Sequence, residues 1–444
     1  MTLRDAIAKA ALGQGGFRLD GATLDVAAQV RAFAPYAGQA ALWPLANTKD
    51  GVADFLAAVA AGVRPVVISP ALPPAKLAGL RAAYGRFAYY VEGRLVGGDG
   101  AAADERLFLA LMTSGSTGEP KLVAINETNL AAGIAAIHDA QGLAGARSTG
   151  VVLPLAYSYA LVNQLLWAVL YEREIYLSGG ALNALAALER FRDAGVEMLC
   201  LVAPWLRFAI GLGLDQVPPL PAVKVVNFAG APFPISDVAA LRRLFPHARL
   251  YNNYGCAEAM PRLAVREVIT AQDPVTLVGR PLPTLKVSLD GEDIGPILFQ
   301  GASASLGTLD VNGRIIDHGA WIAAGDVGEW RGDQLHVLGR HDQVIKVGGE
   351  RLSLMEIERA LLAAGAREAA AWQSAGQVIA AVAAAAPLER KNLTAALRAH
   401  LPRNAWPAVV YGIADWPLLT TGKTDRRRLQ ELARAGDLDV VFSL

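Results

Sequence analysis

The residues that could do chemistry begin with a run of hydroxyls and glycines that ends in a lysine, Thr113-Ser-Gly-Ser-Thr-Gly-Glu-Pro-Lys121. It follows an apolar segment, 107–112, whose pattern predicts a buried strand. Glycines let the backbone turn tightly and present N–H groups, and nearby hydroxyls and a cation complete an anion-binding loop. The Walker A spacing is absent, and a Gly/Ser turn can also be no more than a turn. The four hydroxyls belong to Thr113, Ser114, Ser116 and Thr117.

Two carboxylates and one more lysine complete the set. Glu258 comes after the strand-like segment 248–253, and Asp326 lies in a Gly-Asp pair. Because ligands of open α/β sheets bind beyond the carboxyl ends of strands, Glu258 could hold a metal–nucleotide. Each residue also has a plain structural interpretation: an exposed loop Glu, an Asp that forms a turn, and, for Lys423, a solvated charge.

The elements that must position these residues are short apolar segments at 64–69, 107–115, 150–156, 174–180, 196–204 and 223–232. Amphipathic stretches separate them, which predicts βαβ units and a buried parallel sheet. From about residue 285 short alternating segments favour antiparallel strands, and after 350 the pattern becomes a compact α+β one. We therefore predict an α/β chain with a large N-terminal domain, 1–340, of parallel-rich sheets with a β-rich end. A small α+β C-terminal lid domain, 341–444, follows it.

Composition excludes several classes of protein. The 444 residues carry 41 Lys+Arg against 41 Asp+Glu, and this balance opposes a nucleic-acid partner. With 53% hydrophobic and 18% charged residues the chain is globular, and two cysteines make neither a disulfide framework nor a Cys-rich zinc site. The first residues lack a secretory signal, and the longest apolar segments are too short to span a membrane. We expect a cytoplasmic protein without a membrane span.

The loop Thr113–Lys121 resembles the phosphate loop of the adenylate-forming superfamily, which includes acyl- and aryl-CoA synthetases, peptide-synthetase adenylation domains and firefly luciferase. Further motifs follow in the family's order between about residues 105 and 430. The resemblance implies an AMP-forming acid–thiol ligase that uses ATP and Mg²⁺. Such an enzyme converts a small carboxylic acid to acyl-AMP with release of pyrophosphate, and then transfers the acyl group to a thiol. The further motifs are Ala229–Pro232, Tyr254–Glu258, His341–Arg351 and Thr420–Arg426.

The resemblance also implies roles for individual residues. Lys423, Glu258 and Lys121 would be catalytic, with Glu258 and Thr117 as metal ligands and Lys423 bridging the carboxylate and the α-phosphate. Asp342 would be the hinge of the lid, and Gly348 and Gly349 would line the thiol tunnel. The nucleotide would contact Thr113, Ser114, Gly115, Ser116, Thr117, Gly118, Gly230, Ala231, Pro232, Asn253, Tyr254, Gly255, Asp326 and Arg340.

The acid pocket would be lined by Tyr157, Tyr159, Phe228 and Ala229. This lining predicts a neutral, aromatic pocket and favours an aryl or medium acyl acid, although the two tyrosines could equally pack in the core. Segment 154–160 carries no Asp to pair with an ammonium group, which disfavours α-amino acids because a buried ammonium needs a carboxylate partner. CoA and the phosphopantetheine of an acyl carrier protein stay open as thiol acceptors.

Departures from the family pattern indicate a divergent subfamily. Ala257 stands where relatives usually carry Thr, Leu122 where they commonly have Gly, and Glu127 where many have His. Two alternatives remain: an amino-acid-activating carrier ligase, and a catalytically silent nucleotide-binding paralogue. Ala257 supports the second, whereas intact Lys423 and Glu258 oppose it. The six histidines show no metal-ligand spacing, and we assign none of them a role.

Overall fold

The computed structural model describes the chain except for residues 115–119, 179–183, 204, 207–216, 232, 271–272, 341–343, 348–349, 375, 385–387, 402, 419–423 and 444. The chain forms two compact units. The first comprises Met1–Ser288, Leu298–Ala324 and Gly332–Leu335. The second comprises Leu289–Ile297, Gly325–Arg331 and His336–Leu444.

An eight-stranded sheet in the first unit has the order β18-β17-β7-β6-β3-β2-β4-β5. Its centre is parallel, since β2 pairs with β3 and β4, and β3 pairs with β6. β6 and β7 run antiparallel and place Thr113 opposite Lys121, so the residues of the predicted phosphate loop connect these two strands. The strands are β2 Ala40–Pro44, β3 Arg64–Ile68, β4 Ala88–Val91, β5 Arg94–Val96, β6 Leu109–Ser114, β7 Pro120–Ile125, β17 Gly307–Leu309 and β18 Ile315–Asp317.

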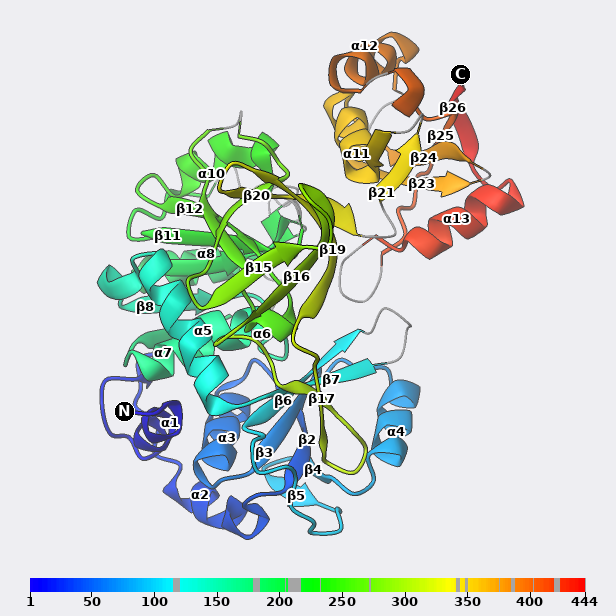
Figure 1. Cartoon of the computed structure of the whole chain (residues 1–444). Coiled ribbons are helices and arrows are strands. Elements are labelled where there is room, and N and C mark those ends of the chain that lie inside the picture. The colour runs from blue at the N-terminus through cyan, green and yellow to red at the C-terminus, as the bar shows by residue number, and fades with distance from the viewer. Residues whose placement is uncertain are drawn as a thin grey trace. The chain divides into compact units, whose positions relative to one another are not determined.

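The alternation of side chains along β2 explains how helices cover both faces of this sheet. Trp43 belongs to the large core that also holds α3, where its ring meets Phe55 edge-on at 6.4 Å between centroids. Leu42 points the other way, into a smaller core with Leu80 of α4. α3 and α4 therefore lie on opposite faces of the sheet, as Figure 1 shows.

A twelve-stranded sheet has the order β1-β9-β8-β10-β11-β12-β13-β14-β20-β19-β16-β15. From β1 to β12 all neighbouring strands are parallel, and β13 and β14 continue antiparallel. The carboxyl ends of β8, β10, β11 and β12 thus share one edge. The strands are β1 Arg18–Leu19, β8 Ser148–Val151, β9 Glu174–Leu177, β10 Met198–Leu201, β11 Val225–Ala229, β12 Arg249–Tyr254, β13 Ala264–Glu267, β14 Leu277–Pro281, β15 Leu285–Leu289, β16 Ile294–Gly301, β19 Ile322–Arg331 and β20 Gln334–Arg340.

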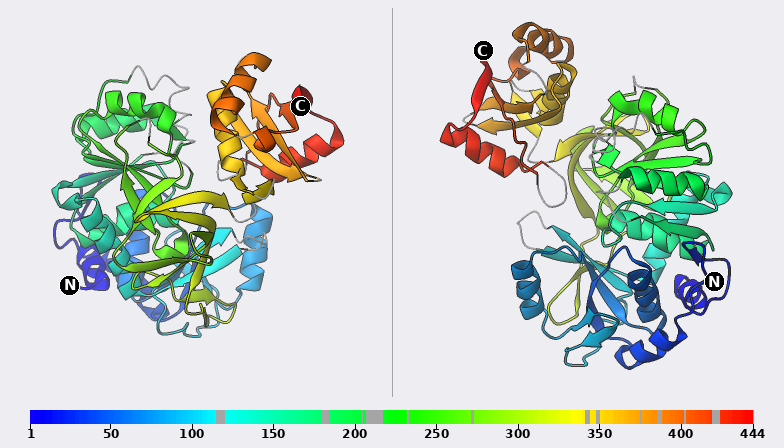
Figure 2. Two further views of the ribbon diagram at one scale, coloured as in Figure 1. Left: turned by 45° about the horizontal axis from the view of Figure 1, so that its top comes forward. Right: turned by 180° about the vertical axis from the view of Figure 1, so that it is seen from behind.

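The helices of the first unit begin at recognisable caps. Thr48 caps α3 by accepting a bond from the Gly51 N–H at 3.0 Å, and Asn126 caps α5 in the same way through Asn129 at 2.7 Å. α1 and α2, at the dark-blue end of the chain in Figure 2, both contact α3. The helices are α1 Leu3–Ala11, α2 Ala27–Phe33, α3 Lys49–Ala60, α4 Pro74–Ala83, α5 Glu127–Ala140, α6 Ser158–Ala160, α7 Trp167–Leu170, α8 Ala184–Asp193 and α10 Val238–Leu244, with 3-10 turns η1 Ala34–Tyr36, η2 Leu143–Gly145, η6 Ile235–Asp237 and η7 Ala257–Ala259.

A π-helical segment, Leu161–Leu166, joins α6 to α7. It is wholly buried, and the Gln164 side-chain amide donates to the Thr149 hydroxyl at 2.8 Å and to the Gly150 carbonyl at 2.7 Å. These bonds fasten the segment to β8. Because π-helical turns are rare and occur often at functional sites, the residues just before it, including Tyr159, are candidates for a functional role.

The second unit contains its own small α+β core. Four strands have the order β23-β24-β25-β26, and a separate hairpin is formed by β21 and β22. Leu361 of α11 and Leu397 of α12 pack in this core with Val410 of β25. The elements are β21 Val344–Val347, β22 Glu350–Ser353, α11 Leu354–Ala363, β23 Glu368–Ser374, β24 Gln377–Ala383, α12 Arg390–His400, η9 Arg403–Ala405, β25 Val409–Gly412, α13 Arg426–Ala435 and β26 Asp439–Ser443.

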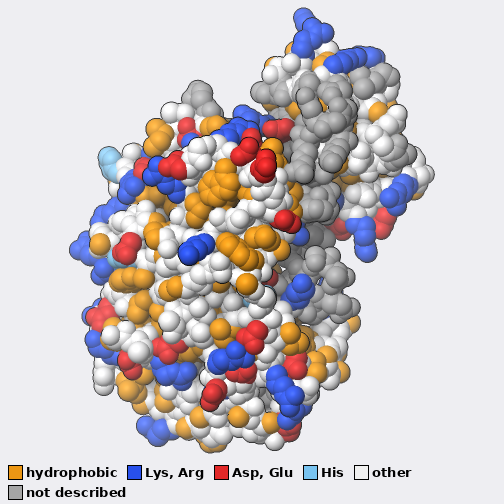
Figure 3. Space-filling model, in the orientation of Figure 1, with side chains coloured by type: hydrophobic (Ala, Val, Ile, Leu, Met, Phe, Trp, Pro, Cys, Tyr) orange, Lys and Arg blue, Asp and Glu red, His pale blue; other side chains and the backbone are white. Residues whose placement is uncertain are grey.

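The predicted fold class is confirmed: parallel-rich sheets with helices come first, antiparallel strands follow, and a small α+β part closes the chain. Every apolar segment predicted as a strand overlaps one, although β8, Ser148–Val151, shares only its last two residues with the predicted segment 150–156. No helix of the described residues has the length and apolarity needed to cross a membrane. Figure 3 shows acidic and basic side chains intermixed over the visible face. The predicted boundary at 340/341 and its hinge at Asp342 stay predictions, since residues 341–343 lie outside the described part.

Candidate active site

The shared edge of β10, β11 and β12 carries the first group of predicted site residues. β11 and β12 lie side by side (Figure 1), and Gly230 follows β11 directly. Gly230 has φ of +81°, a left-handed conformation that favours glycine, and no atom of the described residues lies within 4 Å of where its Cβ would stand. Ala231 is exposed. The backbone after β11 is therefore open to a ligand.

A buried amide network fixes the ends of β11 and β12 beneath this edge. The Gln141 amide donates to Asn227 Oδ1 at 2.6 Å and to Asn253 Oδ1 at 2.9 Å, and the Asn253 amide also donates to Asn227 Oδ1 at 3.0 Å. Asn253 also donates to the Phe228 carbonyl at 3.1 Å. The geometry gives the Asn253 amide a framework role, and its predicted contact with the nucleotide stays a prediction.

Glu258 lies in the short turn η7 just after β12, and it is half-buried. Its carbonyl accepts the Ser305 N–H at 2.7 Å, and the Ser305 hydroxyl bonds to Nε2 of His318 at 3.0 Å. Burial lowers the pKa of His318, while nearby Glu258 opposes and Lys121 adds to that shift. His318 therefore lies within electrostatic range of two predicted catalytic residues.

No local pattern in the sequence marks His318 or Ser305. They approach Glu258 and Lys121 because β17 pairs antiparallel with β7 (Figure 1), and β18 pairs with β17. This pairing joins segments far apart in the chain. A contact of that kind cannot be found from local spacing.

The described residues fit a metal held mainly by a nucleotide. They contain no group of three or more His, Cys, Asp or Glu that could hold an ion. Mg²⁺ usually takes one or two carboxylates and completes its octahedron with phosphates and water, so the single carboxylate of Glu258 suits a Mg–nucleotide. Thr117, the second predicted metal ligand, lies outside the described residues.

Gly255 and Tyr254 form the predicted adenine segment. A Cβ on Gly255 would stand 2.1 Å from the Pro261 carbonyl and 2.8 Å from the Cα of Arg262, so only glycine fits. Tyr254 is half-buried against a small apolar cluster. Ala257 packs at the border of the main core, and its methyl side chain offers no hydroxyl where relatives usually carry Thr.

Asp326 and Arg340 lie on neighbouring strands, β19 and β20, and the structure brings them together. Arg340 Nε is 3.8 Å from Asp326 Oδ1. Gly325 has φ of +83°, and a Cβ there would stand 3.4 Å from the Arg340 guanidinium. The Asp326 side chain is 19% exposed, so its carboxylate is accessible to paired hydroxyl donors such as those of a ribose.

The predicted pocket residues differ in exposure. Tyr157 is 41% exposed, whereas Phe228 is 1% exposed and meets Phe233 edge-on at 4.9 Å. Ala229 is half-buried at the end of β11. Tyr159 is half-buried, and its hydroxyl donates to the Leu201 carbonyl at 3.4 Å.

The prediction of a neutral surrounding for Tyr159 is wrong in one respect. The guanidinium carbon of Arg262 lies 5.1 Å from the centroid of the Tyr159 ring. Arg262 is 1% exposed. The sequence did offer a signal, an arginine inside the apolar segment 259–265, but local pattern alone indicates a surface charge there.

Several predicted residues lie outside the described part of the chain, and their roles stay predictions. Thr113 is described, and its hydroxyl is 3.5 Å from the Lys121 carbonyl; Lys121 is exposed. The predicted residues outside the described part are Gly115, Ser116, Thr117, Gly118, Pro232, Asp342, Gly348, Gly349 and Lys423.

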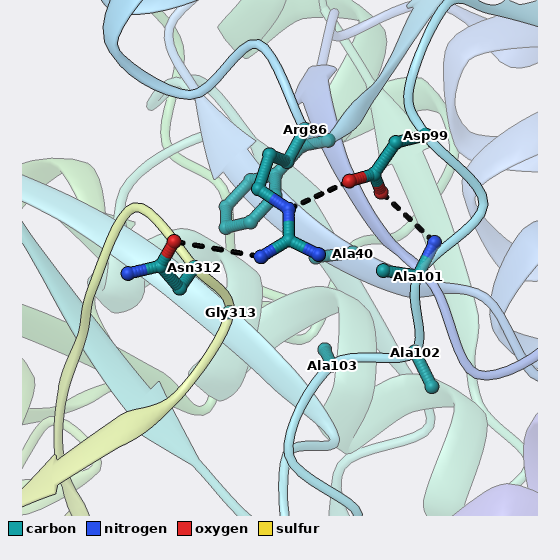
Figure 4. Close-up of a pocket in the computed structure, with 9 residues that line it drawn as sticks. Ala40, Arg86, Asp99, Ala101, Ala102, Ala103, Asn312 and Gly313 are labelled. Atoms are coloured by element: carbon teal, nitrogen blue, oxygen red, sulfur yellow. Dashed lines mark hydrogen bonds and ion pairs between the residues drawn. The ribbon is translucent and has the colours of Figure 1, made fainter.

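A small pocket elsewhere in the first unit is drawn in Figure 4. Arg86 and Asp99 lie on its wall and are paired, with Nε to Oδ2 at 2.7 Å, and Arg86 also reaches Asn312 Oδ1 at 3.4 Å. Four alanines and Gly313 make up much of the rest of the wall. These groups satisfy one another and offer no reactive side chain.

Comparison with known proteins finds a matching family and several similar proteins. Residues 98–313 match the family of AMP-binding enzymes. A plipastatin synthase protein of Bacillus subtilis is 25% identical over 366 residues, which are 76% of this chain and 14% of that protein. D-alanine–D-alanyl carrier protein ligase of Staphylococcus haemolyticus is 26% identical over 72% of this chain and 70% of its own length.

Among solved structures, o-succinylbenzoate coenzyme A synthetase from Bacillus subtilis, in complex with ATP and magnesium ion, superposes with a TM-score of 0.80. The match has 18% identity and covers 97% of this chain and 99% of that one. The matched segment, 98–313, lies within a chain whose fold is that of the synthetase. The family match over residues 98–313 and the similarity to a carrier protein ligase support the resemblance to the adenylate-forming superfamily that the sequence motifs indicated.

Proposed function

We propose that this protein is an AMP-forming acid–thiol ligase. It activates a small carboxylic acid with ATP and Mg²⁺ to acyl-AMP and pyrophosphate, and then passes the acyl group to a thiol. The observation that carries this proposal is that Ser305 bonds to both the Glu258 carbonyl and His318, and that His318 also senses the charge of Lys121 on β7, one of the two strands that the predicted phosphate loop connects. We place the reaction in the cytoplasm.

Each residue has a physical role in the first step. Glu258 holds Mg²⁺, which neutralises charge on the phosphates when it is bound. The loop from Thr113 to Lys121 supplies N–H groups and hydroxyls, and Lys423 stabilises the charge that develops between carboxylate and α-phosphate. The carboxylate of Asp326 accepts the ribose hydroxyls, and Arg340 beside it supports that contact.

The second step uses the C-terminal part of the chain. We propose that the lid, 341–444, turns about Asp342 and removes Lys423 from the site, so that one pocket serves two transition states. Gly348 and Gly349 then approach the thiol. The small core of the second unit supports a lid that moves as one body. The acceptor is CoA or the phosphopantetheine of a carrier protein.

An amino-acid-activating carrier ligase is the second candidate, favoured by the carrier-protein ligase of Staphylococcus haemolyticus, which matches this chain at 26% identity. The described surroundings of Tyr159 oppose it. Arg262, not a carboxylate, faces that ring, and a cation repels an ammonium group.

The test is acid-dependent release of pyrophosphate from Mg-ATP without any thiol, over aryl, acyl and amino acids. The panel includes D-alanine and o-succinylbenzoate, which the names of the two matched enzymes supply. Release with one class of acid supports the ligase and names its substrate class. Subsequent addition of CoA or a carrier protein then identifies the acceptor. ATP binding without release for any acid refutes the proposal and leaves a silent paralogue.

A further inference from the structure

Arg262 is a buried cation whose charge has no partner among the described residues. Its side chain is 1% exposed, and none of its three guanidinium nitrogens has a hydrogen-bond partner there. Arginine keeps its charge in proteins and carries five N–H donors. Most buried charges are paired or bonded, so a guanidinium in this state calls for an explanation.

The groups around Arg262 do not supply the missing anion. Tyr159 offers the face of its ring at 5.1 Å, and Cys200 lies beside both side chains at the end of β10. Burial raises the pKa of the Cys200 thiol to about 12 and the pKa of Tyr159 well above 10. Both groups are therefore neutral near pH 7, so among the described residues Tyr159 and Cys200 offer the guanidinium polar and ring contacts but no anion.

Backbone contacts place Arg262 at the candidate active site. It lies four positions after Glu258, and its Cα lies so close to Gly255 that a Cβ on that glycine would stand 2.8 Å away. Its side chain reaches Tyr159, a predicted wall of the acid pocket. Arg262 thus connects the predicted adenine segment with the predicted acid pocket.

An anionic group on a ligand would pair with the uncompensated charge of the Arg262 guanidinium. A carboxylate suits best, because its two oxygens match the planar fork of a guanidinium and accept two parallel bonds. Removal from water makes such a pair strong and selective, since an uncharged ligand leaves the guanidinium unpaired. The described lining offers no equivalent contact for an ammonium group.

We propose that Arg262 binds a second carboxylate of the acid substrate, so that the enzyme activates one end of a dicarboxylic acid. This inference rests on the proposed function and refines its substrate class to an aryl or acyl diacid. Arg262 holds the far carboxylate, while the near carboxylate attacks the α-phosphate. The attack forms the acyl–phosphate bond and expels pyrophosphate, and the far carboxylate takes no part in the bond changes.

The experiment compares diacids with their monomethyl esters, which have nearly the same shape but one charge fewer. The panel runs from malonic to sebacic acid and includes the three benzenedicarboxylic acids. Pyrophosphate release from Mg-ATP gives kcat/KM for each compound. The full-length enzyme is compared with Arg262→Met, which keeps an apolar stem, and with Arg262→Lys, which keeps the charge without the fork. Arg249→Met is the matched control, because Arg249 begins β12 at the opposite end and pairs with Glu267.

We expect the wild type to prefer its best diacid at least tenfold over the monoester. Arg262→Met should lose at least tenfold on the diacid and nothing on the ester, with Arg262→Lys between them and Arg249→Met unchanged. The melting temperature of unliganded Arg262→Met should equal or exceed that of the wild type, because the substitution removes an unpaired buried charge. The rise in melting temperature that the diacid causes should disappear in this variant.

Three results overturn the inference while leaving adenylation intact. In the first, the esters have a kcat/KM equal to or above that of their diacids in the wild type. In the second, Arg262→Met lowers kcat/KM equally for diacid and ester. In the third, unliganded Arg262→Met melts well below the wild type. The last two would mean that Arg262 acts on the reacting carboxylate or on the fold. If ATP raises the melting temperature but no acid of any class releases pyrophosphate, the proposed function itself fails.

Discussion

Gly255 packs directly on the backbone of Arg262. A Cβ on the glycine would stand 2.8 Å from the Arg262 Cα and 2.1 Å from the Pro261 carbonyl oxygen. The segment predicted to hold adenine and the residue that we assign to the far end of the acid are therefore coupled through main-chain atoms. A backbone shift at Gly255 must therefore move the backbone of Arg262.

We predict that Gly255→Ala destabilises the protein by more than about 3 kcal/mol, because rigid backbone atoms must move to admit the methyl group. Gly79→Ala, at an exposed position of α4 with open space around it, should instead stabilise by about 0.5–1 kcal/mol. Urea unfolding of both variants beside the wild type measures the two changes. Equal stability of Gly255→Ala and the wild type would contradict the close contact.

Lys423→Ala should lower the rate of adenylation about 100- to 1,000-fold, since a positioned cation is lost from the transition state. The affinity for Mg-ATP should change little, because other residues hold the phosphates. Pyrophosphate release and ATP titration measure the two quantities. Lys391→Ala, at an exposed site of α12, serves as the control. Release at the wild-type rate in Lys423→Ala would remove this lysine from the mechanism.

Glu258→Gln should raise the Mg²⁺ concentration needed for half-maximal activity by at least about tenfold, because loss of even an outer partner of a metal site costs about 10- to 100-fold. The measurement is pyrophosphate release at fixed ATP over a range of Mg²⁺ concentrations. Glu189→Gln, exposed on α8, is the control and should leave the curve in place. An unchanged curve for Glu258→Gln would show that the metal is held elsewhere.

Asp104 makes the stability of the first unit depend on pH. Bonds from Arg106, 3.0 Å from Nε to Oδ1 and 2.9 Å from Nη2 to Oδ2, lower the pKa of Asp104 from 3.8 to about 2. A carboxyl whose pKa is lower in the folded than in the unfolded chain stabilises the fold at pH values above its unfolded-state pKa. The stabilisation by Asp104 is therefore complete above about pH 4.5 and is lost as the pH falls towards 2. Because Arg106 is exposed and solvent screens its charge, the interaction contributes about 1–2 kcal/mol to the free energy of unfolding.

Asp104→Asn should therefore lower the unfolding free energy by about 1–2 kcal/mol at pH 7, and the difference should shrink at pH 3. Urea unfolding at pH 7, 5 and 3 measures this trend. Asp415→Asn, at an exposed position, should show no such dependence. A difference that is constant across the three pH values would contradict the assignment.

The fold was predictable where local pattern decides it. The continuous apolar segments at 64–69 and 223–232 are β3 and β11, because a strand buried on both faces needs apolar side chains throughout. Asp326 and Arg340 were also predictable, since the strands that carry them are neighbours in the chain and in the sheet.

Residues that depend on distant pairing could not be predicted. His318 reaches Glu258 through the pairing of β17 with β7, and no local spacing encodes that contact. Arg262 was missed because charge alone suggests the surface, whereas the packing of Tyr159 and Cys200 buries it. The family resemblance implied that Asn253 contacts the nucleotide, whereas the described side chain bonds to Asn227 beneath the strand ends.

The most direct test of the central claim follows oxygen from the acid to the nucleotide. The enzyme is given Mg-ATP and its preferred acid labelled with ¹⁸O in the carboxylate, and after thiol transfer the AMP is analysed by mass spectrometry. Attack of the carboxylate on the α-phosphate predicts one ¹⁸O in AMP and none in pyrophosphate. Label in inorganic phosphate with ADP as the nucleotide product, or unlabelled AMP, would contradict an acyl-adenylate intermediate.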